Sequence, residues 1–222
     1  MKEIVLDTET TGLLVKDGHK VVEIGCLELD DLVPTSNKFH CYLNPERKVS
    51  EKALEVHGYT DKFLADKKKF VEIADEFLNF IKDKKLIIHN AEFDIAHLNN
   101  ELEIIGKKKI DKKNVIDTLE LARIKFPGSM ISLDALCKRF RIDNSKREKH
   151  TALLDCELLT KVYVNLIGQK EPTLNFSSSI QNIDEKKLNE QNNYFKKIIK
   201  PTSKELELNK KFLKNYLKKN FY

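Results

Sequence analysis

Short apolar runs separated by turns dominate the first part of the chain. The runs at 1–6, 21–29 and 36–43 are rich in Ile, Val, Leu and Phe and are too short for typical helices. Segments of this length and composition are typical of β-strands. Because only turns separate these runs, we expect the three strands to form an antiparallel meander.

The pattern then changes to helices that alternate with further strands. Apolar residues recur at helical spacing from Phe70 to Ile81, which predicts an amphipathic helix. Asn90 and Thr151 are predicted to cap the helices that follow them. The remaining predicted elements are strands at 86–88 and 115–117 and helices at 50–56, 91–105, 119–125, 133–140 and 151–166. This order predicts an α/β domain over residues 1–168, with a mixed five-stranded sheet flanked by helices.

The composition changes after residue 168. Asn, Gln, Ser and Lys dominate residues 169–200, which predicts a flexible linker. Thr202 and Glu205 then have the spacing of a capping box, and an apolar stripe that includes Leu206 and Phe212 follows them. We expect residues 201–222 to form a helix that docks on a partner or on the main domain.

Composition and charge limit the possible classes of protein. The chain has 222 residues, 41% of them hydrophobic, and lacks an apolar segment long enough for a membrane span or signal peptide. Its four cysteines form no CxxC pair, which favours reduced thiols and a cytoplasmic location. Residues 177–222 hold eleven lysines and five acids, a balance of +6, which leaves about −1 of the net charge of +5 for residues 1–176. We therefore expect any nucleic acid to bind the main domain through local basic clusters and metal ions.

Acidic residues follow the first predicted strand. Asp7 and Glu9 are two residues apart, so their side chains should point the same way from that strand. Two neighbouring carboxylates repel each other unless a cation lies between them, although this pair alone also fits solvated acids at a strand end. Asp94 and Asp155 lie in the first turns of predicted helices, and His150 lies just before the second of them.

Together these residues predict a metal-dependent site. Four carboxylates offer hard oxygen ligands, which select Mg²⁺ or Mn²⁺ over zinc. Two such ions about 4 Å apart suit in-line phosphoryl chemistry. A neutral His150 could accept a proton from the attacking water, although alone it also fits an exposed histidine. The basic loop before it, 138–149, is expected to be mobile and to attract phosphate. His97 is expected on a helix surface.

Three segments resemble the motifs of the DEDDh, or DnaQ-like, exonuclease family. They are LDTETTG at 6–12, HNAEFD at 89–94 and HTALLD at 150–155, in the order and spacing of that family. The segments at 126–128, 132–137 and 142–147 further resemble the proofreading subunits of bacterial replicative DNA polymerases. The resemblance covers about residues 1–168. It implies a ribonuclease-H-like fold and two-metal 3′→5′ hydrolysis that releases nucleoside monophosphates from single-stranded or frayed 3′ ends.

The resemblance also implies roles for individual residues. Asp7, Glu9, Asp94 and Asp155 would bind two divalent ions, Mg²⁺ or Mn²⁺, and His150 would be the general base. The residues expected to contact the nucleotide are Asp7, Glu9, Thr10, His57, Phe93 and Asp155. Glu92 departs from the motif, where a small residue is more usual. His89 and Asn90 are expected to support the fold.

The C-terminal part of the chain fits the same resemblance. Residues 201–222 would anchor the chain to the polymerase catalytic subunit, and Leu174 with Phe176 could bind the sliding clamp. The usual clamp peptide has a glutamine where this chain has Glu171. We therefore expect a proofreading exonuclease acting on DNA 3′ ends. The alternatives are a related enzyme that trims RNA 3′ ends and a catalytically silent scaffold bound to polymerase.

Overall fold

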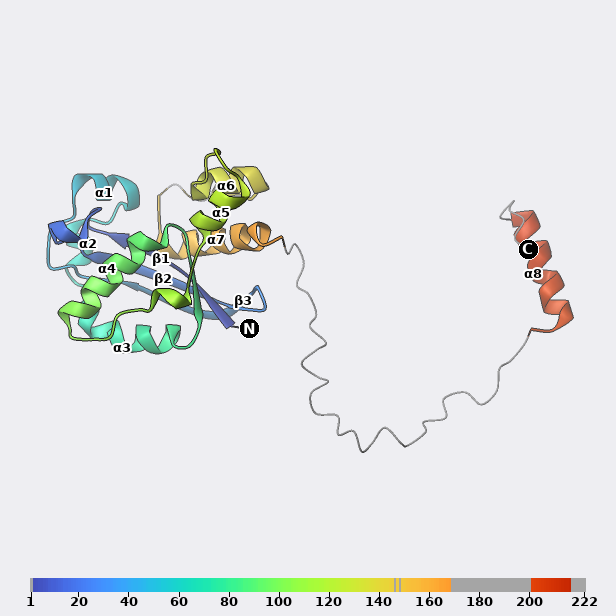
Figure 1. Ribbon diagram of the computed structural model, residues 1–222, viewed down its shortest axis with the longest axis horizontal. Helices are drawn as coiled ribbons and strands as arrows, with labels where there is room; N and C mark the ends of the chain where they lie inside the picture. Colours follow the sequence, from blue (N-terminus) through green and yellow to red (C-terminus); the bar gives the residue numbers. More distant parts are fainter. Residues whose placement is uncertain (1, 146, 148, 169–200, 217–222) are drawn as a thin grey trace, which may run out of the picture. The chain divides into compact units, whose positions relative to one another are not determined.

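A mixed five-stranded sheet organises the main domain of the computed structural model, which describes residues 2–145, 147, 149–168 and 201–216 (Figure 1). The strand order is β3-β2-β1-β4-β5. The first three strands pair antiparallel, and β4 and β5 run parallel to β1. The strands are β1 Lys2–Thr10, β2 Val21–Asp30, β3 Val33–Tyr42, β4 Lys85–Ile88 and β5 Val115–Asp117. The predicted α/β class and sheet are confirmed.

Helices connect the later strands and follow β5. Each predicted helix of the main domain has a counterpart within a few residues, whereas α2 and the two 3-10 helices are additional. The helices are α1 Glu51–His57, α2 Asp61–Leu64, α3 Phe70–Ile81, α4 Ala91–Ile104, α5 Thr118–Lys125, α6 Leu133–Phe140 and α7 Ala152–Leu166, with 3-10 helices η1 Val15–Asp17 and η2 Lys112–Asn114.

The alternation of side chains on β1 divides the core into two layers. Ile4 and Leu6 belong to the buried cluster that includes α3 and α4, and Val5 belongs to the cluster that includes α6 and α7. In Figure 1, α3 and α4 lie on one side of the sheet, and α5, α6 and α7 lie on the other. Asp7 and Glu9 continue the series of Val5, so they face the α7 side where β1 ends.

The starts of α4 and α7 differ from the prediction. Asn90 adopts a left-handed conformation with a φ of 66° and forms no side-chain cap. Asp117 satisfies this helix start instead, since its carboxylate accepts from the backbone N–H groups of Asn90 and Ala91 at 3.0 Å each. Thr151 also forms no side-chain cap. The capping predictions for Asn90 and Thr151 are therefore wrong.

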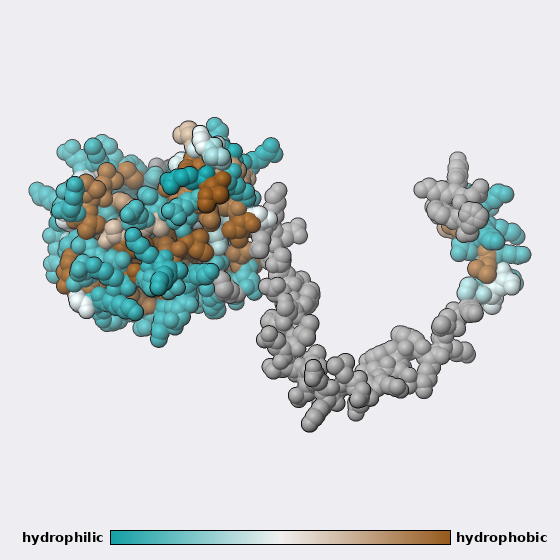
Figure 2. All heavy atoms as spheres, viewed as in Figure 1, coloured by the Kyte–Doolittle hydropathy of each residue, from teal (hydrophilic) through white to brown (hydrophobic). Residues whose placement is uncertain are grey.

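The second described segment contains α8, Ser203–Tyr216. Its predicted capping box is present, because the Thr202 N–H donates to Glu205 at 2.7 Å and the Glu205 N–H donates to Thr202 at 3.3 Å. Apolar side chains, including Leu206, lie exposed among hydrophilic ones on this helix (Figure 2). The chain separates into two compact units, 1–174 and 175–222. The predicted linker, with Leu174 and Phe176, lies outside the described residues. Among the described helices, none has the length and apolarity needed to cross a membrane.

Candidate active site

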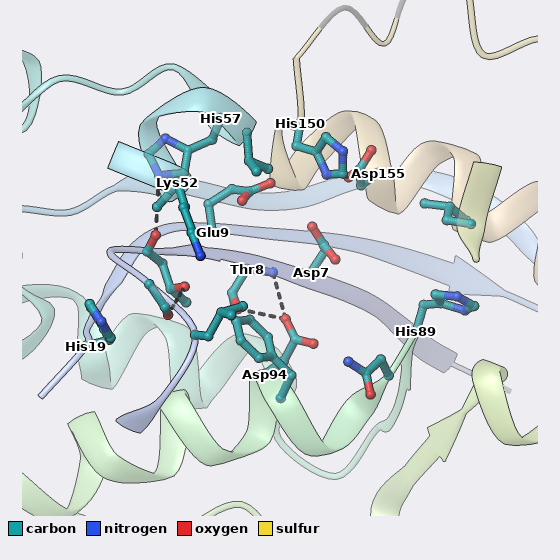
Figure 3. A pocket seen from close by; sticks show the side chains of 18 of the residues that line it. Asp7, Thr8, Glu9, His19, Lys52, His57, His89, Asp94, His150 and Asp155 are labelled. Atoms are coloured by element: carbon teal, nitrogen blue, oxygen red, sulfur yellow. Dashed lines mark hydrogen bonds and ion pairs between the residues drawn. The ribbon is translucent and has the colours of Figure 1, made fainter. Parts of the chain in front are cut away.

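One cavity of about 810 Å³ collects the chemical residues that were predicted from distant parts of the sequence. It lies where β1 ends and where α4 and α7 begin (Figure 3). A volume in this range is typical of small-molecule and cofactor sites. The predicted residues that line it are Asp7, Glu9, Thr10, His57, Phe93, Asp94, His150 and Asp155.

Asp7 and Glu9 are held on β1 in a crowded acidic environment. Burial raises the pKa of Asp7 well above its usual value, and repulsion from Asp94, then Asp155, adds to the effect. Burial is also the main cause that raises the pKa of Glu9 to about 8, with Asp155 as the next contributor. Both shifts express the cost of placing several carboxylates in one partly buried site.

Asp94 enters the cavity from the first turn of α4. Its Oδ1 accepts two hydrogen bonds from Thr8, one from the backbone N–H at 3.0 Å and one from the hydroxyl at 2.7 Å. Burial raises the pKa of Asp94 to about 7, and the bonds from Thr8 oppose that rise. Thr8 points to the opposite face of β1 from Asp7, so the strand fixes both acids relative to each other (Figure 3).

Asp155 and His150 come from the start of α7. His150 Nδ1 lies 3.6 Å from Asp155 Oδ2. One possible ligand atom from each of Glu9, His150 and Asp155 lies within 4.8 Å of the others, a spacing over which one cation could bridge them. Burial, followed by the charge of Arg147, lowers the pKa of His150, which favours the neutral form that a general base requires.

A buried glutamate positions the start of α7. Glu23 on β2 is fully buried, and its Oε2 accepts from the Ala152 N–H at 2.9 Å and from the Tyr59 hydroxyl at 2.8 Å. Its Oε1 contacts His40 Nε2 at 2.7 Å. Glu23 therefore replaces the predicted Thr151 cap. The sequence gives no local signal for this contact, since 129 positions separate Glu23 from Ala152.

Arg147 lies inside the acidic site, although the sequence predicts a mobile loop at this position. Its Nε and Nη2 donate to the two oxygens of Asp155 at 2.6 Å each. Its Nη2 also donates to His150 Nδ1 at 2.9 Å, and its Nη1 donates to Asp134 at 2.8 Å. The Arg147 side chain is 7% exposed, a buried position that the sequence did not predict for it, and the mobility of the loop stays a prediction.

His57 and Phe93, two of the predicted nucleotide-contacting residues, line the cavity beside the acids. The Tyr59 N–H donates to His57 Nδ1 at 2.9 Å, so His57 Nε2 carries the proton that it directs to the Thr10 carbonyl at 3.3 Å. Phe93 packs its ring 4.5 Å from that of His97. His97 is 1% exposed, so the expectation of a surface position is wrong. Aromatic rings therefore form part of the cavity lining.

Further residues line the cavity that the sequence did not single out. Lys52 on α1 directs its amine into the cavity (Figure 3), and Leu13 and Leu14 present exposed apolar side chains at its rim. An apolar pair directly after a glycine turn is a signal that could have indicated Leu13 and Leu14. His89 also lines the cavity, and its Nδ1 contacts the Thr118 hydroxyl at 2.9 Å, consistent with the predicted supporting role.

The donor set fits hard divalent cations. It consists of carboxylate oxygens and one imidazole, the ligand types that suit Mg²⁺ and Mn²⁺ better than thiophilic metals. The raised pKa values of Glu9 and Asp94 indicate a site that lacks positive charge for its number of acids. Among the described residues, the guanidinium of Arg147 donates hydrogen bonds to Asp155 and supplies part of the missing positive charge.

Comparisons with known proteins agree with this geometry. Residues 4–163 match the RNase T family model, which is described as an exonuclease. The chain is 47% identical to the DNA polymerase III subunit epsilon of Rickettsia conorii over 224 residues, covering 98% of this chain and 97% of that protein. It is 48% identical to the DNA polymerase III subunit epsilon of Escherichia coli over 175 residues, covering 75% of this chain and 72% of that protein.

Solved structures share the fold of the main domain. Exonuclease X in complex with 5′ overhanging duplex DNA matches with a TM-score of 0.60 and 24% identity, covering 75% of this chain and 92% of that chain. The nuclease domain of 3′hExo, a DEDDh family member bound to rAMP, matches with a TM-score of 0.65 and 17% identity, covering 75% and 91%. The ribonuclease-H-like architecture predicted from the motifs therefore recurs in these nucleases.

Proposed function

The chain belongs to the exonuclease family and, within it, to the DNA polymerase III epsilon subunits; from this premise we propose that it removes mispaired nucleotides from DNA 3′ ends. It acts as a 3′→5′ exonuclease associated with a replicative polymerase and releases nucleoside monophosphates. The observation that carries this proposal is the cavity in which Asp7, Glu9, Asp94 and Asp155 meet beside His150.

The four carboxylates would hold the divalent cations on which the family depends. Asp7 and Glu9 bind from β1, Asp94 from α4 and Asp155 from α7. Two ions, Mg²⁺ or Mn²⁺, would lower the pKa of an attacking water and stabilise the leaving 3′ oxygen. Because the acids come from rigid strand and helix positions, the fold sets their separation before substrate arrives.

His150 would accept the proton of the attacking water. It lies beside Asp155 at the mouth of the acid cluster, and its side chain is 45% exposed, so water reaches it. Its lowered pKa keeps the ring neutral near neutral pH. The attacking oxygen forms a bond to phosphorus as the bond to the 3′ oxygen breaks, and the proton passes to the imidazole.

The cavity wall would orient the terminal nucleotide. Phe93 offers an aromatic face for a base or sugar, and the ring of His57, held against the Thr10 carbonyl, lines the same cavity. Aromatic faces stack on any base, which suits an enzyme that must remove all four nucleotides. The Lys52 amine adds a positive charge to the cavity that would hold the phosphate of the substrate.

The tail would connect the nuclease to its polymerase. Residues 201–222 would dock through the apolar side chains of α8, among them Leu206 and Leu208, onto the catalytic subunit. Such a tether raises the local concentration of nuclease at the primer end. Deleting 201–222 should abolish co-purification with polymerase while hydrolysis of single-stranded DNA persists. Retained co-purification would contradict the anchor.

The clamp contact through Leu174 and Phe176 and the cytoplasmic location stay predictions.

The competing functions make different predictions for substrate choice. The similarity to epsilon subunits extends over 98% of the chain, including the tail, which favours DNA proofreading over RNA trimming. A silent scaffold is disfavoured because the acids and His150 all line one cavity. The test compares a mispaired primer, a paired primer and an RNA strand with Mg²⁺. We expect fastest release from the mispaired DNA; faster release from RNA would instead support the alternative enzyme.

A further inference from the structure

Arg147 holds the carboxylate of Asp155, which a divalent ion would also need as a ligand. It is anchored within the acid cluster, and its contacts use both oxygens of Asp155, at 2.6 Å each. A fork of two parallel N–H donors on one carboxylate is the strongest pairing that an arginine makes. Since the Asp155 side chain is only 4% exposed, water screens this pair poorly.

Arg147 also contacts His150, a second residue that could bind a metal ion. An arginine can only donate hydrogen bonds, so the contact at 2.9 Å makes His150 Nδ1 the acceptor. Together with Glu9, Asp155 and His150 form the group whose possible ligand atoms lie within 4.8 Å of one another. One guanidinium therefore engages two of the three residues that a cation would bridge.

We propose that Arg147 is a resident counter-cation, which holds Asp155 and His150 in the metal-free protein and leaves the Asp155 carboxylate when a divalent ion binds. This inference rests on the proposed function, because it concerns the same acids. It adds that metal binding is an exchange of one cation for another, so Arg147 weakens the apparent affinity of the site for metal. The exchange also releases His150 for its role as base.

Asp134 on α6 gives the displaced guanidinium a place to remain. It accepts from Arg147 Nη1 at 2.8 Å, and it lines the same cavity. Its side chain is 55% exposed, so this contact lies nearer the solvent than the contact with Asp155. Arg147 can therefore leave Asp155 by a side-chain movement while one of its ion pairs persists, and the loop need not unfold.

The first test measures Mn²⁺ affinity of the full chain by calorimetry, without nucleic acid. Arg147→Met should bind Mn²⁺ at least about tenfold more tightly than wild type, since the competing cation is gone. Its melting temperature in EDTA should fall, and its Mn²⁺-induced rise should exceed that of wild type. Arg139→Met is the matched control, because this guanidinium lies 4.4 Å over the Phe126 ring; its Mn²⁺ affinity should equal that of wild type.

The second test uses unmodified protein and does not depend on a variant that folds. The Arg147 Nε–H should give a slowly exchanging NMR signal in EDTA, and saturating Mg²⁺ should shift it or remove it. Unchanged or weaker Mn²⁺ affinity in Arg147→Met, or an Arg147 signal that is unaffected by Mg²⁺, would overturn the proposal. Nucleotide release by wild type is measured separately, so a failure of the nuclease function is distinguishable from a failure of the cation exchange.

Discussion

Gly25 on β2 and Ala152 on α7 lie so close that a Cβ on Gly25 would come within 2.6 Å of the Ala152 carbonyl carbon. Gly25 is also the β-ladder partner of Asp7. The missing side chain at this position therefore lets the start of α7, with His150 and Asp155, approach the strand that carries the other acids. Any larger residue must move backbone, because the nearest atoms belong to the main chain.

Gly25→Ala should consequently damage both stability and catalysis. Overpacking of this kind costs about 1–3 kcal/mol in unfolding free energy, and displacement of α7 should lower the specific activity of the folded fraction at least about tenfold. Gly106→Ala is the control. The φ of 67° at Gly106 strains an alanine, but no atom of the described residues lies within 4 Å of the added Cβ. It should lose stability with unchanged specific activity. Equal specific activities for the two variants would contradict the positioning role of Gly25.

Glu23 offers an independent test of how α7 is positioned. Glu23→Ala leaves the Ala152 N–H and the Tyr59 hydroxyl without their buried acceptor, which should cost about 1–3 kcal/mol of unfolding free energy and lower activity. Glu23→Gln keeps a carbonyl oxygen at that place and should remain close to wild type. Chemical denaturation and nucleotide release measure the two effects. Similar losses in both variants would show that the hydrogen bonds are not the cause.

The raised pKa values predict how pH changes the stability of the metal-free protein. The pKa of Glu9 is about 8 in the folded chain against an ordinary 4.5, so between these values the folded state binds a proton that the unfolded state has released. Stability in EDTA should therefore fall as pH rises from 5 to 8, and Asp94, with a pKa of about 7, adds to the fall below pH 7.

Thermal melting in EDTA and in Mg²⁺ across this pH range checks that expectation. Mg²⁺ should oppose the fall, so its stabilising effect should grow with pH. Glu9→Gln should flatten the profile in EDTA because it removes one of the titrating groups. A stability that rises from pH 5 to pH 8 without metal would show that the acids do not repel each other as the structure indicates.

His150 should determine the acidic limb of the activity profile at saturating Mg²⁺. A general base must be unprotonated, and burial lowers its pKa from 6.5, so activity should fall with a midpoint below pH 6.5. His150→Gln should lower kcat about 10²–10⁴-fold and abolish this limb. Loss of activity with an unchanged pH profile would instead indicate that His150 only supports the site.

Local patterns in the sequence were sufficient to predict the order of the elements and the acids. Alternation along β1 correctly put Asp7 and Glu9 on one face, and helical spacing correctly predicted α3. The positions of Asp94 and Asp155 at helix starts predicted that they join this pair, the resemblance gave the same set of acids, and the structure places all four in one cavity. Their roles as metal ligands stay a prediction.

The long-range contacts could not be predicted in the same way. Asn90 looked like an N-cap, but the cap comes from Asp117 on a neighbouring strand. Glu23 looked like an ordinary strand residue, and Gly25 carried no signal of its contact with α7. Arg147 was one of several basic residues in its loop. Which of them enters the acid cluster depends on packing between elements distant in sequence, and local periodicity carries no information about that.

The most direct test of the central claim measures nucleoside monophosphate release from a mispaired primer 3′ end by wild type and by Asp7→Asn. The variant keeps the shape of the side chain and removes one anionic ligand from the cluster. We predict rapid release by wild type in Mg²⁺, none in EDTA, and release more than about 100-fold slower by Asp7→Asn, since even residues that only support metal ligands cost about 10–100-fold when lost. Equal release by the two proteins in Mg²⁺, or undiminished release in EDTA, would contradict the claim that these acids form a cation-dependent nuclease site.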